Sequence, residues 1–324
     1  MRLSELGERA LLRYLLPRLK RVGDYLWAGD DGVDLPGQGR LVLTGDMLVE
    51  CTDVPRGMGY RDAGWKAVTS SVSDLAAKGA RPILCYVELG LRPDMSFDEF
   101  EELWSGIEEA CEAYSAALVG GDTNEAKELI VGVFALGSAE RPVPRRGAKA
   151  GQLVGTTGRF GRTAAGLHAV MNGVTDERWS PLVKTFLRPV ARVREGIALS
   201  GHARSMIDSS DGLAASLREL MELNGVGFEI DSPPVDDLAV EYAEAFGLDP
   251  YRLVFEGGEE YELVFTFDPD EEGEVRRRLA EVGCELHVIG RVTGDGKIKA
   301  VWEGKEVEVE PRGWEHFLGR GTSS

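Results

Sequence analysis

The stretch DAGWKAVTSSVSDLAAKGARPILCYVELGL, residues 62–91, is the part of the sequence that decides the fold. Over residues 62–78 small and apolar residues recur at helical intervals, and Gly79 suits a helix end because glycine adopts a left-handed backbone without strain. Residues 82–91 form an apolar run with isoleucine, tyrosine and valine, which is typical of a strand. The stretch therefore predicts a helix, a turn and a strand, which is the repeating unit of an α/β protein.

Similar elements are predicted on both sides of this stretch. Upstream, residues 41–43 are an apolar run of the β type that ends at Thr44-Gly45-Asp46. Downstream, a helix is expected over 96–114 and strands over 116–119, stopping at Gly120-Gly121-Asp122, and over 129–137. The first half of the chain therefore alternates between strands and helices.

A segment rich in proline, glycine and basic residues, PVPRRGAKAG at 142–151, has the composition of a stretch between domains. A single core usually stops growing at roughly 250 to 300 residues, so a chain of 324 residues favours two domains. We expect an N-terminal domain over 1–140 and a second α/β domain over 141–324. The strands expected in the second domain lie near 153–157, 226–230, 263–267 and 286–289.

Composition and charge limit the partners of the protein. The 37 basic residues against 55 acidic ones give a formal charge of −18, which opposes non-specific binding to nucleic acid or to an anionic membrane. The four cysteines lack CxxC spacing, so neither a zinc site nor a disulfide framework is indicated. There is no signal-peptide pattern and no run of about 20 apolar residues, so a location in the reducing cytoplasm is expected.

Acidic residues recur beside glycine, serine or threonine in five short segments. They are Gly29-Asp30-Asp31-Gly32, Thr44-Gly45-Asp46, Ser73-Asp74, Gly120-Gly121-Asp122-Thr123 and Asp208-Ser209-Ser210-Asp211-Gly212. Magnesium that serves phosphoryl transfer is held between carboxylates and substrate phosphates. Any one of these segments alone is more often a turn or a helix N-cap. Their joint occurrence favours a shared site for magnesium and phosphate.

The common nucleotide-binding motifs do not occur in the sequence. It has no GxxxxGK[ST] loop, no GxGxxG after a strand and no protein-kinase HRD or DFG set. A glycine-spaced turn before a predicted helix, Gly158-Arg159-Phe160-Gly161-Arg162, is either a plain turn or an anion site at the helix N-terminus. A P-loop or protein-kinase fold is therefore not expected.

Taken together, these segments resemble the thiamine-monophosphate kinase branch, in its archaeal form, of the superfamily that contains aminoimidazole ribonucleotide synthetase. The residues that carry the resemblance run in order along nearly the whole chain: ELGE (5–8), GDDGV (29–33), DMLVE (46–50), SVSDLAAKGARP (71–82), GGDT (120–123), RRGAKAG (145–151), IDSSDGL (207–213), GGEEYEL (257–263), IGRV (289–292) and GWEHF (313–317). The resemblance implies an α/β (α+β) fold of two domains. The N-terminal domain, a mixed sheet with helices, would bind ATP and magnesium and form the dimer, and the C-terminal α/β domain would complete the active site.

The resemblance also implies which residues form the site. The expected metal ligands are Asp30, Thr44, Asp46, Asp74, Asp122, Asp208 and Asp211. The expected ATP contacts are Trp104, Gly121, Asp122, Arg146 and Ser210, and the expected substrate contacts are Asp53, Glu259 and Trp314. Three positions depart from the bacterial pattern: Asp53 stands for a histidine, Gly45 for a threonine and Glu260 for an aspartate.

The implied reaction is the ATP-dependent phosphorylation of thiamine monophosphate to thiamine diphosphate. The acceptor phosphate would attack the γ-phosphorus in line, with several Mg²⁺ ions offsetting the repulsion between the phosphates and with no catalytic side chain. The implied partners are ATP, thiamine monophosphate and a second copy of the chain in a homodimer. Two alternatives remain open: an ATP-dependent synthetase of the same superfamily that activates an amide, and a nucleotide-binding protein without turnover.

Overall fold

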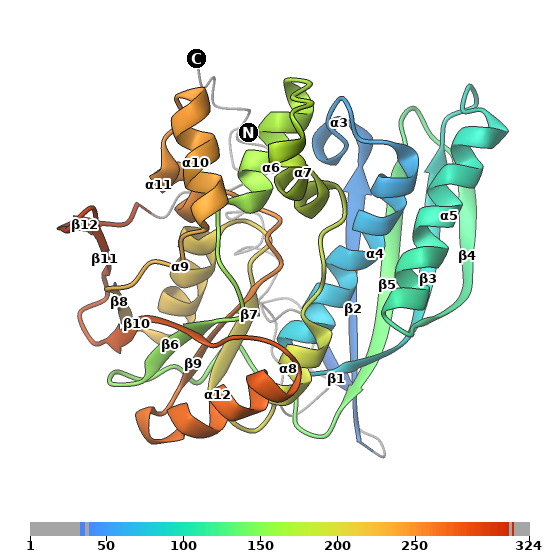
Figure 1. Cartoon of the computed structure of the whole chain (residues 1–324). Coiled ribbons are helices and arrows are strands. Elements are labelled where there is room, and N and C mark those ends of the chain that lie inside the picture. Colours follow the sequence, from blue (N-terminus) through green and yellow to red (C-terminus); the bar gives the residue numbers. More distant parts are fainter. Residues whose placement is uncertain (1–32, 36–38, 311–312, 314–324) are drawn as a thin grey trace, which may run out of the picture.

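The computed structural model describes residues 33–35, 39–310 and 313 (Figure 1). The first of its two sheets contains β1 (Val33–Leu35), β2 (Arg40–Val49), β3 (Arg81–Leu91), β4 (Ala117–Glu125) and β5 (Ile130–Ala139). Their order is β1-β2-β5-β3-β4. Strands β3 and β4 pair in parallel and the other neighbours are antiparallel, so the sheet is mixed, as the resemblance implies.

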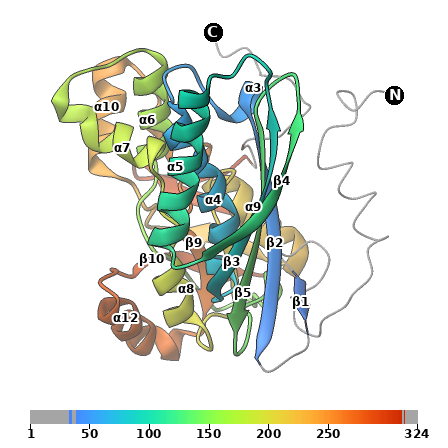
Figure 2. The ribbon, with the colours of Figure 1, turned by 90° about the vertical axis from the view of Figure 1, so that its right-hand side faces the viewer.

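Helices α4 (Tyr60–Ala77) and α5 (Phe97–Ala113) cover one face of this sheet (Figure 2). Helix α5 begins with a capping box, in which Ser96 accepts a hydrogen bond from the Glu99 amide and the Glu99 carboxylate accepts one from the Ser96 amide. Strand side chains such as Val87 and Val133 share a buried core with Val68 of α4. A short helix, α3 (Glu50–Asp53), follows β2.

The opposite face of the first sheet exposes apolar side chains. Residues alternate between the two faces of a strand, so the neighbours of buried residues point outward. Leu43, Met47, Tyr86 and Phe134 do so and are between 38% and 66% exposed; we call the surface that they define the outer sheet face. Gathered apolar side chains of this kind are typical of a protein–protein interface.

The second sheet contains β6 (Leu153–Thr156), β7 (Ser205–Asp208), β8 (Gly227–Ile230), β9 (Leu263–Phe267), β10 (His287–Thr293), β11 (Ile298–Trp302) and β12 (Lys305–Glu308). Their order is β12-β11-β8-β10-β6-β9-β7. The accompanying helices are α6 (Arg162–Met171), α7 (Ser180–Leu187), α8 (Val193–Leu199), α9 (Leu213–Asn224), α10 (Asp237–Phe246), α11 (Pro250–Phe255) and α12 (Glu272–Glu281), with the 3₁₀ turns η2 (Glu177–Trp179) and η3 (Pro269–Glu271).

Helices pack on this sheet through two separate cores. Leu217 of α9 lies in one core with Phe228 and Ile289, and Leu279 of α12 lies in the other with Phe265. Figure 1 shows α9 and α12 on opposite sides of the strands. The two-domain α/β class predicted from the sequence is confirmed, while the division at residue 140 stays a prediction. Within the described residues, no helix is both long enough and apolar enough to span a bilayer.

The structure corrects where two of the predicted strands end. Strand β2 continues through Thr44-Gly45-Asp46, and β4 continues through Gly120-Gly121-Asp122. Pairing extends both strands, because β2 bonds to β5 along its whole length and β4 bonds to β3 as far as Glu125. Asp46 and Asp122 therefore lie within strands, where the pleat fixes the face to which each side chain points.

Candidate active site

Three predicted metal ligands meet between the two sheets. They come from β2 (Asp46), the last turn of α4 (Asp74) and the end of β7 (Asp208). Ser73 Oγ donates to Asp208 Oδ2 at 2.6 Å, so α4 contacts the second sheet here. Thr44 Oγ1 donates to Asp74 Oδ2 at 2.5 Å, which ties α4 to β2. We call Asp46, Asp74 and Asp208 the carboxylate cluster.

The side chains around the cluster raise its affinity for protons. The pKa of Asp46 is raised to about 6, first by burial and then by the charge of Asp208, while a hydrogen bond with Asp74 acts the other way. Burial also raises the pKa of Asp74, and the charges of Asp46 and Asp208 add to this effect. The pKa of Asp208 is raised mainly by burial. Three carboxylates that repel one another are a donor set suited to a hard divalent cation.

These carboxylates do not by themselves complete a metal site. Among the residues that the structure describes, no three His, Cys, Asp or Glu side chains converge on one metal position. Mg²⁺ usually takes only one or two carboxylates and fills its remaining positions with water and substrate phosphates. The cluster therefore fits magnesium that arrives with a phosphate-bearing substrate.

Two basic side chains lie behind the cluster. Lys78 is fully buried and its Nζ donates to the Met206 carbonyl at 3.1 Å. Arg145 donates to Glu219 at 2.6 Å, and the charges of Arg145 and Lys78 both lower the pKa of Asp208 against the effect of burial. Sequence reasoning missed Arg145, although it is the direct neighbour of the predicted Arg146.

Arg146 itself points away from the cluster. It is exposed, and its Nη1 donates to the Leu223 carbonyl at 3.5 Å, at the C-terminal end of α9. The Arg-Arg pair gives no sequence signal for which side chain turns inward. The half-buried Arg145 is therefore a further candidate for a phosphate contact.

Asp122 lies away from the cluster in a single chain. The register runs from Asp122 to Glu88, from Glu88 to Gly132 and from Gly132 to Met47, and residues paired in this way share one face. Asp122 therefore belongs to the outer sheet face, whereas Asp46, next to Met47, points to the other side. Gly121 lies against β3, and a Cβ there would meet the Val87 carbonyl oxygen at 2.0 Å.

The remaining predicted nucleotide contacts are spread over both halves. Trp104 is half-buried on α5, stacks on Phe100 with ring centroids 6.2 Å apart, and donates to Glu108. Ser210 is exposed, and Asp211 follows it directly after the cluster. The structure thus places Ser210 and Asp211 beside the cluster, and Trp104 on a separate helix.

Tyr261 is a residue of this region that sequence reasoning did not select. Its ring is buried and its backbone has a left-handed φ of 51°. Burial raises the pKa of its hydroxyl, and the charges of the four acidic residues around it add to the effect; these are Glu259, Asp46, Asp208 and Asp211. Tyr261 is therefore close both to the cluster and to the predicted substrate residue Glu259.

The predicted substrate residues Asp53 and Glu259 are joined by Lys66 of α4. Lys66 Nζ donates to the Asp53 carbonyl at 2.8 Å and forms an ion pair with the Glu259 carboxylate. The Asp53 carboxylate accepts from the Val49 amide at 2.7 Å, which holds the first turn of α3. The structure thus brings Asp53 and Glu259 together, although Asp53 ends α3 and Glu259 lies in the loop between α11 and β9.

Two departures from the bacterial pattern have local explanations. Gly45 faces the ring of Phe134, and a Cβ there would lie 2.8 Å from that ring. Glu260 is buried and accepts from the amides of Gly161 and Thr163 at 2.7 and 3.1 Å, at the first turn of α6. In the glycine-spaced turn at 158–162, the N-terminal amides of α6 are thus occupied by the chain's own Glu260 carboxyl group.

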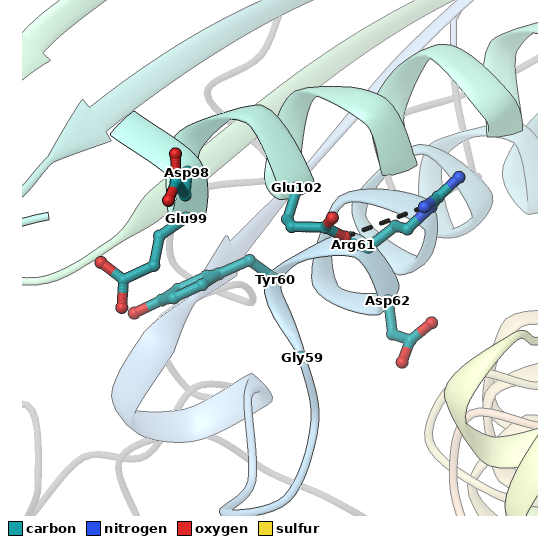
Figure 3. Close-up of a pocket in the computed structure, with 7 residues that line it drawn as sticks. All are labelled: Gly59, Tyr60, Arg61, Asp62, Asp98, Glu99 and Glu102. Carbon is teal, nitrogen blue, oxygen red and sulfur yellow. Dashed lines mark ion pairs between the residues drawn. The ribbon is translucent and has the colours of Figure 1, made fainter. Parts of the chain in front are cut away.

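A surface hollow lies at the N-terminal ends of α4 and α5 (Figure 3). It is lined by Gly59, Tyr60, Arg61, Asp62, Asp98, Glu99 and Glu102. Arg61 pairs with Glu102 across it at 3.9 Å. None of the predicted site residues lines this hollow. Of those residues, Asp30 and Trp314 lie outside the part of the chain that the structure describes.

Comparison with known proteins agrees with this fold. Two family models match, the N-terminal domain of AIR synthase related protein at residues 29–139 and its C-terminal domain at 149–303. Thiamine-monophosphate kinase of Pyrococcus abyssi is 37% identical over 86% of this chain and 86% of its own. The thiamine-monophosphate kinase of Aquifex aeolicus is 33% identical over 98% of this chain and 100% of its own.

A solved structure is similar over the same length. AaThiL complexed with AMPPCP and TMP has a TM-score of 0.86 and 31% identity, covering 98% of this chain and 99% of that chain. The chain thus has the two-domain fold of the AIR synthase related proteins. Within that group it belongs to the thiamine-monophosphate kinase family, which confirms the resemblance drawn from the sequence.

Proposed function

We propose that this chain phosphorylates thiamine monophosphate to thiamine diphosphate with ATP, in a magnesium site built on the carboxylate cluster. The observation that carries the proposal is that Asp46, Asp74 and Asp208, from three elements far apart in the sequence, lie close enough for their charges to act on one another. Relatives named thiamine-monophosphate kinase, and a solved relative that holds an ATP analogue together with TMP, support the choice of substrates.

The chemical problem is to bring two phosphate groups together. Two unit charges about 4 Å apart repel by roughly 4 kcal/mol at an effective dielectric of 20. Mg²⁺, when bound, would supply positive charge that offsets this repulsion. Asp46, Asp74 and Asp208 would hold it, with Thr44, Asp211, Asp30 and Asp122 as the further ligands implied by the family.

The chain's own residues position the two substrates. Arg145, with Ser210 and Gly121, would contact the ATP phosphates, and Trp104 would lie near the base. Asp53, Glu259 and Trp314 would hold the acceptor. The second pKa of a phosphate monoester is about 6, so the attacking oxygen is already ionised at neutral pH and no general base is required. Orientation and charge compensation are thus the main contributions of the protein.

A homodimer is part of this proposal. The apolar outer sheet face supports an interface between two copies, and Asp122 borders this face in the register of the sheet. In such a dimer, Asp122 of the partner subunit would complete the metal site that the single chain leaves open. The N-terminal domain at 1–140 would then dimerise and bind ATP, and the domain at 141–324 would close the site. We propose a cytoplasmic location on the sequence grounds given above.

The test is an assay with purified protein, ATP, Mg²⁺ and a panel of acceptors. Thiamine monophosphate should be converted to thiamine diphosphate with one ADP released per product, and turnover should stop when EDTA removes the metal. ADP release only with an amide substrate would establish the synthetase alternative instead. Nucleotide binding without ADP release would establish the non-catalytic one.

A further inference from the structure

We propose that Lys66 is a positioning residue for the acceptor substrate, holding the Glu259 carboxylate in the orientation that receives thiamine monophosphate. The inference rests on the proposed function, in which Glu259 and Asp53 contact the acceptor. Lys66 belongs to none of the metal, nucleotide or substrate positions that the family resemblance implies. It deepens the proposed site by adding the residue that orients the Glu259 side chain and contacts the backbone of Asp53.

Lys66 is a buried cation with three well-defined neighbours. Its side chain is 5% exposed and that of Glu259 is 29% exposed, so Glu259 is the more accessible member of the pair. The ammonium pairs with Glu259, donates to the Asp53 carbonyl at 2.8 Å and lies 5.4 Å above the centre of the Phe186 ring. A lysine so enclosed is used for its fixed charge, because burying an unpaired ammonium is costly.

The segment that carries Glu259 needs such an anchor. Glu259 and Tyr261 both have left-handed φ values, 65° and 51°, which cost of order 1 kcal/mol or more for residues other than glycine. The Glu259 amide donates to the Ser210 carbonyl at 2.6 Å, and that of Tyr261 donates to Ser209 at 2.9 Å. These bonds hold the backbone, and Lys66 holds the side chain.

The charge of Lys66 also suits the role. Burial raises the pKa of Glu259, and the charge of Asp53 adds to this, while Lys66 acts in the opposite direction. Lys66 thus favours the ionised form of Glu259 at the end of the site that would receive the cationic ring of thiamine. The ammonium contacts the Glu259 carboxylate and the Asp53 backbone carbonyl, and the Asp53 carboxylate lies close enough to act on Glu259, so acidic groups outnumber basic ones here, which complements that ring.

Helix α4 carries both the Lys66 contact and one member of the carboxylate cluster, Asp74. Lys66 lies eight residues before Asp74, which corresponds to about 12 Å along a helix axis. The helix contacts the second half of the molecule near both positions, through Lys66 to Glu259 and through Ser73 to Asp208. One rigid helix therefore fixes the spacing between the acceptor site and the cluster.

A double-mutant cycle tests the proposal with the full-length protein. Wild type, Lys66→Met, Glu259→Gln and the double variant are compared by their KM for thiamine monophosphate and for ATP at saturating Mg²⁺. Lys66→Met should raise KM for thiamine monophosphate about tenfold in the wild-type background and less than about twofold in the Glu259→Gln background. KM for ATP should stay within about twofold throughout, because Lys66 acts on the acceptor alone.

Arg188→Met provides a matched control. Arg188 also ties the first half to the second half of the chain, through Asp62 of α4 at 2.6 Å and Glu109 of α5 at 2.8 Å, and Asp62 lies one turn nearer the N-terminus of α4 than Lys66. It should leave KM for thiamine monophosphate unchanged. If Lys66→Met does not fold, Lys66→Arg takes its place in the cycle, with about a threefold effect expected in the wild-type background only.

The outcomes separate the inference from the proposed function. Equal effects of Lys66→Met in both backgrounds would mean a purely structural lysine and would overturn the inference. An unchanged KM in Glu259→Gln alone would remove Glu259 from the acceptor site and the inference with it, while leaving the kinase activity in place. Absence of thiamine diphosphate with the wild-type protein would instead overturn the proposed function.

Discussion

Ser73 Oγ donates a hydrogen bond of 2.6 Å to Asp208 Oδ2, joining residues that are 135 positions apart. Both residues are buried, and the bond links α4 to the end of β7. A hydroxyl in this position fixes which oxygen of Asp208 is left for a metal ion. Partners that orient a metal ligand in this way commonly change metal affinity by 10- to 100-fold when they are removed.

Ser73→Ala should therefore weaken magnesium binding while leaving the substrate contacts in place. We expect the Mg²⁺ concentration for half-maximal activity to rise about tenfold, with KM for thiamine monophosphate unchanged at saturating Mg²⁺. Ser70→Ala is the control, because the Ser70 hydroxyl donates only to the Ala67 carbonyl of its own helix. Magnesium titrations of the steady-state rate measure both variants; the same titration curve for Ser73→Ala and wild type would contradict the role assigned to Ser73.

Asp74→Asn should lose activity and gain stability. Turnover should fall at least about a hundredfold, because a carboxylate that serves the transferred phosphate is lost. The pKa of Asp74 is raised in the folded protein, so its ionised form lowers the free energy of unfolding at pH 7. Asparagine removes this cost, and the Tm without metal should rise by roughly 2–4 °C for each kcal/mol recovered.

Calorimetry with EDTA and with Mg²⁺ checks this prediction. Magnesium should stabilise the wild type more than it stabilises Asp74→Asn. Glu101→Gln, which changes an exposed carboxylate of α5, should alter neither Tm nor turnover. A lower Tm for Asp74→Asn without metal would show that Asp74 is a structural acceptor for Thr44 rather than part of a repelling cluster.

Glu260 should make stability depend on pH near neutrality. Its pKa is raised from 4.5 to about 7, chiefly by burial, so the folded state favours the protonated form. The contribution of this group is complete below pH 4.5 and is lost as the pH rises through 7, a change of about 3 kcal/mol at most. Glu260→Gln keeps an oxygen for the amides of Gly161 and Thr163 but does not titrate.

Urea unfolding of the two proteins at pH 5, 6, 7 and 8 tests this. The stability of Glu260→Gln relative to wild type should increase steadily over the series, because all other titrating groups cancel in the difference. A constant difference between the two proteins would mean that the helix N-terminus of α6 keeps Glu260 ionised throughout.

Mixed dimers should show on which subunit Asp122 acts. Asp74→Asn and Asp122→Asn should each be inactive alone. When the two are coexpressed in equal amounts, half of the dimers are mixed, and each mixed dimer has one intact site of two if Asp122 serves the partner's cluster. Activity should then recover to roughly a quarter of that of wild type.

The alternative gives a distinct result. If Asp122 served the cluster of its own chain, every site in a mixed dimer would carry one defect and activity would stay absent. Met47→Asp, which places a charge on the outer sheet face, should convert the dimer to a monomer by light scattering and abolish turnover. An active monomer would contradict both the interface and the shared site.

The sequence predicts the regular elements well, because residue periodicity records which side of an element is buried. Helix α4 and strand β3 differ from their predicted ranges by two residues or fewer at each end. The prediction from sequence fails where the bounds of an element depend on pairing with residues far along the chain. Pairing with β3 extends β4 through Asp122, and only that pairing reveals that Asp122 and Asp46 point to opposite faces.

The candidate site also has features that the sequence predicts and features that depend on contacts between distant residues. The recurrence of Asp beside small residues predicts a shared site, and the charges of Asp46, Asp74 and Asp208 do act on one another, while their role as metal ligands stays a prediction. Lys66 looks like an ordinary lysine of an amphipathic helix, because Glu259 lies on a distant segment. Arg145 and Arg146 are chemically identical neighbours, and only their partners from a distant part of the chain, Glu219 for Arg145 and the Leu223 carbonyl for Arg146, distinguish them.

Helix α4 bonds to the second half of the molecule through Lys66, Ser73 and Lys78, over about 18 Å of its length. A hinge motion that separates the two halves would therefore have to break all three bonds together. Substrate binding and product release must then depend on the motion of shorter segments, while the contact between α4 and the second half stays in place. If a conformational change limits the rate of turnover, we expect it in those segments. A spectroscopic probe of the distance between the two halves should therefore give an unchanged signal during catalysis.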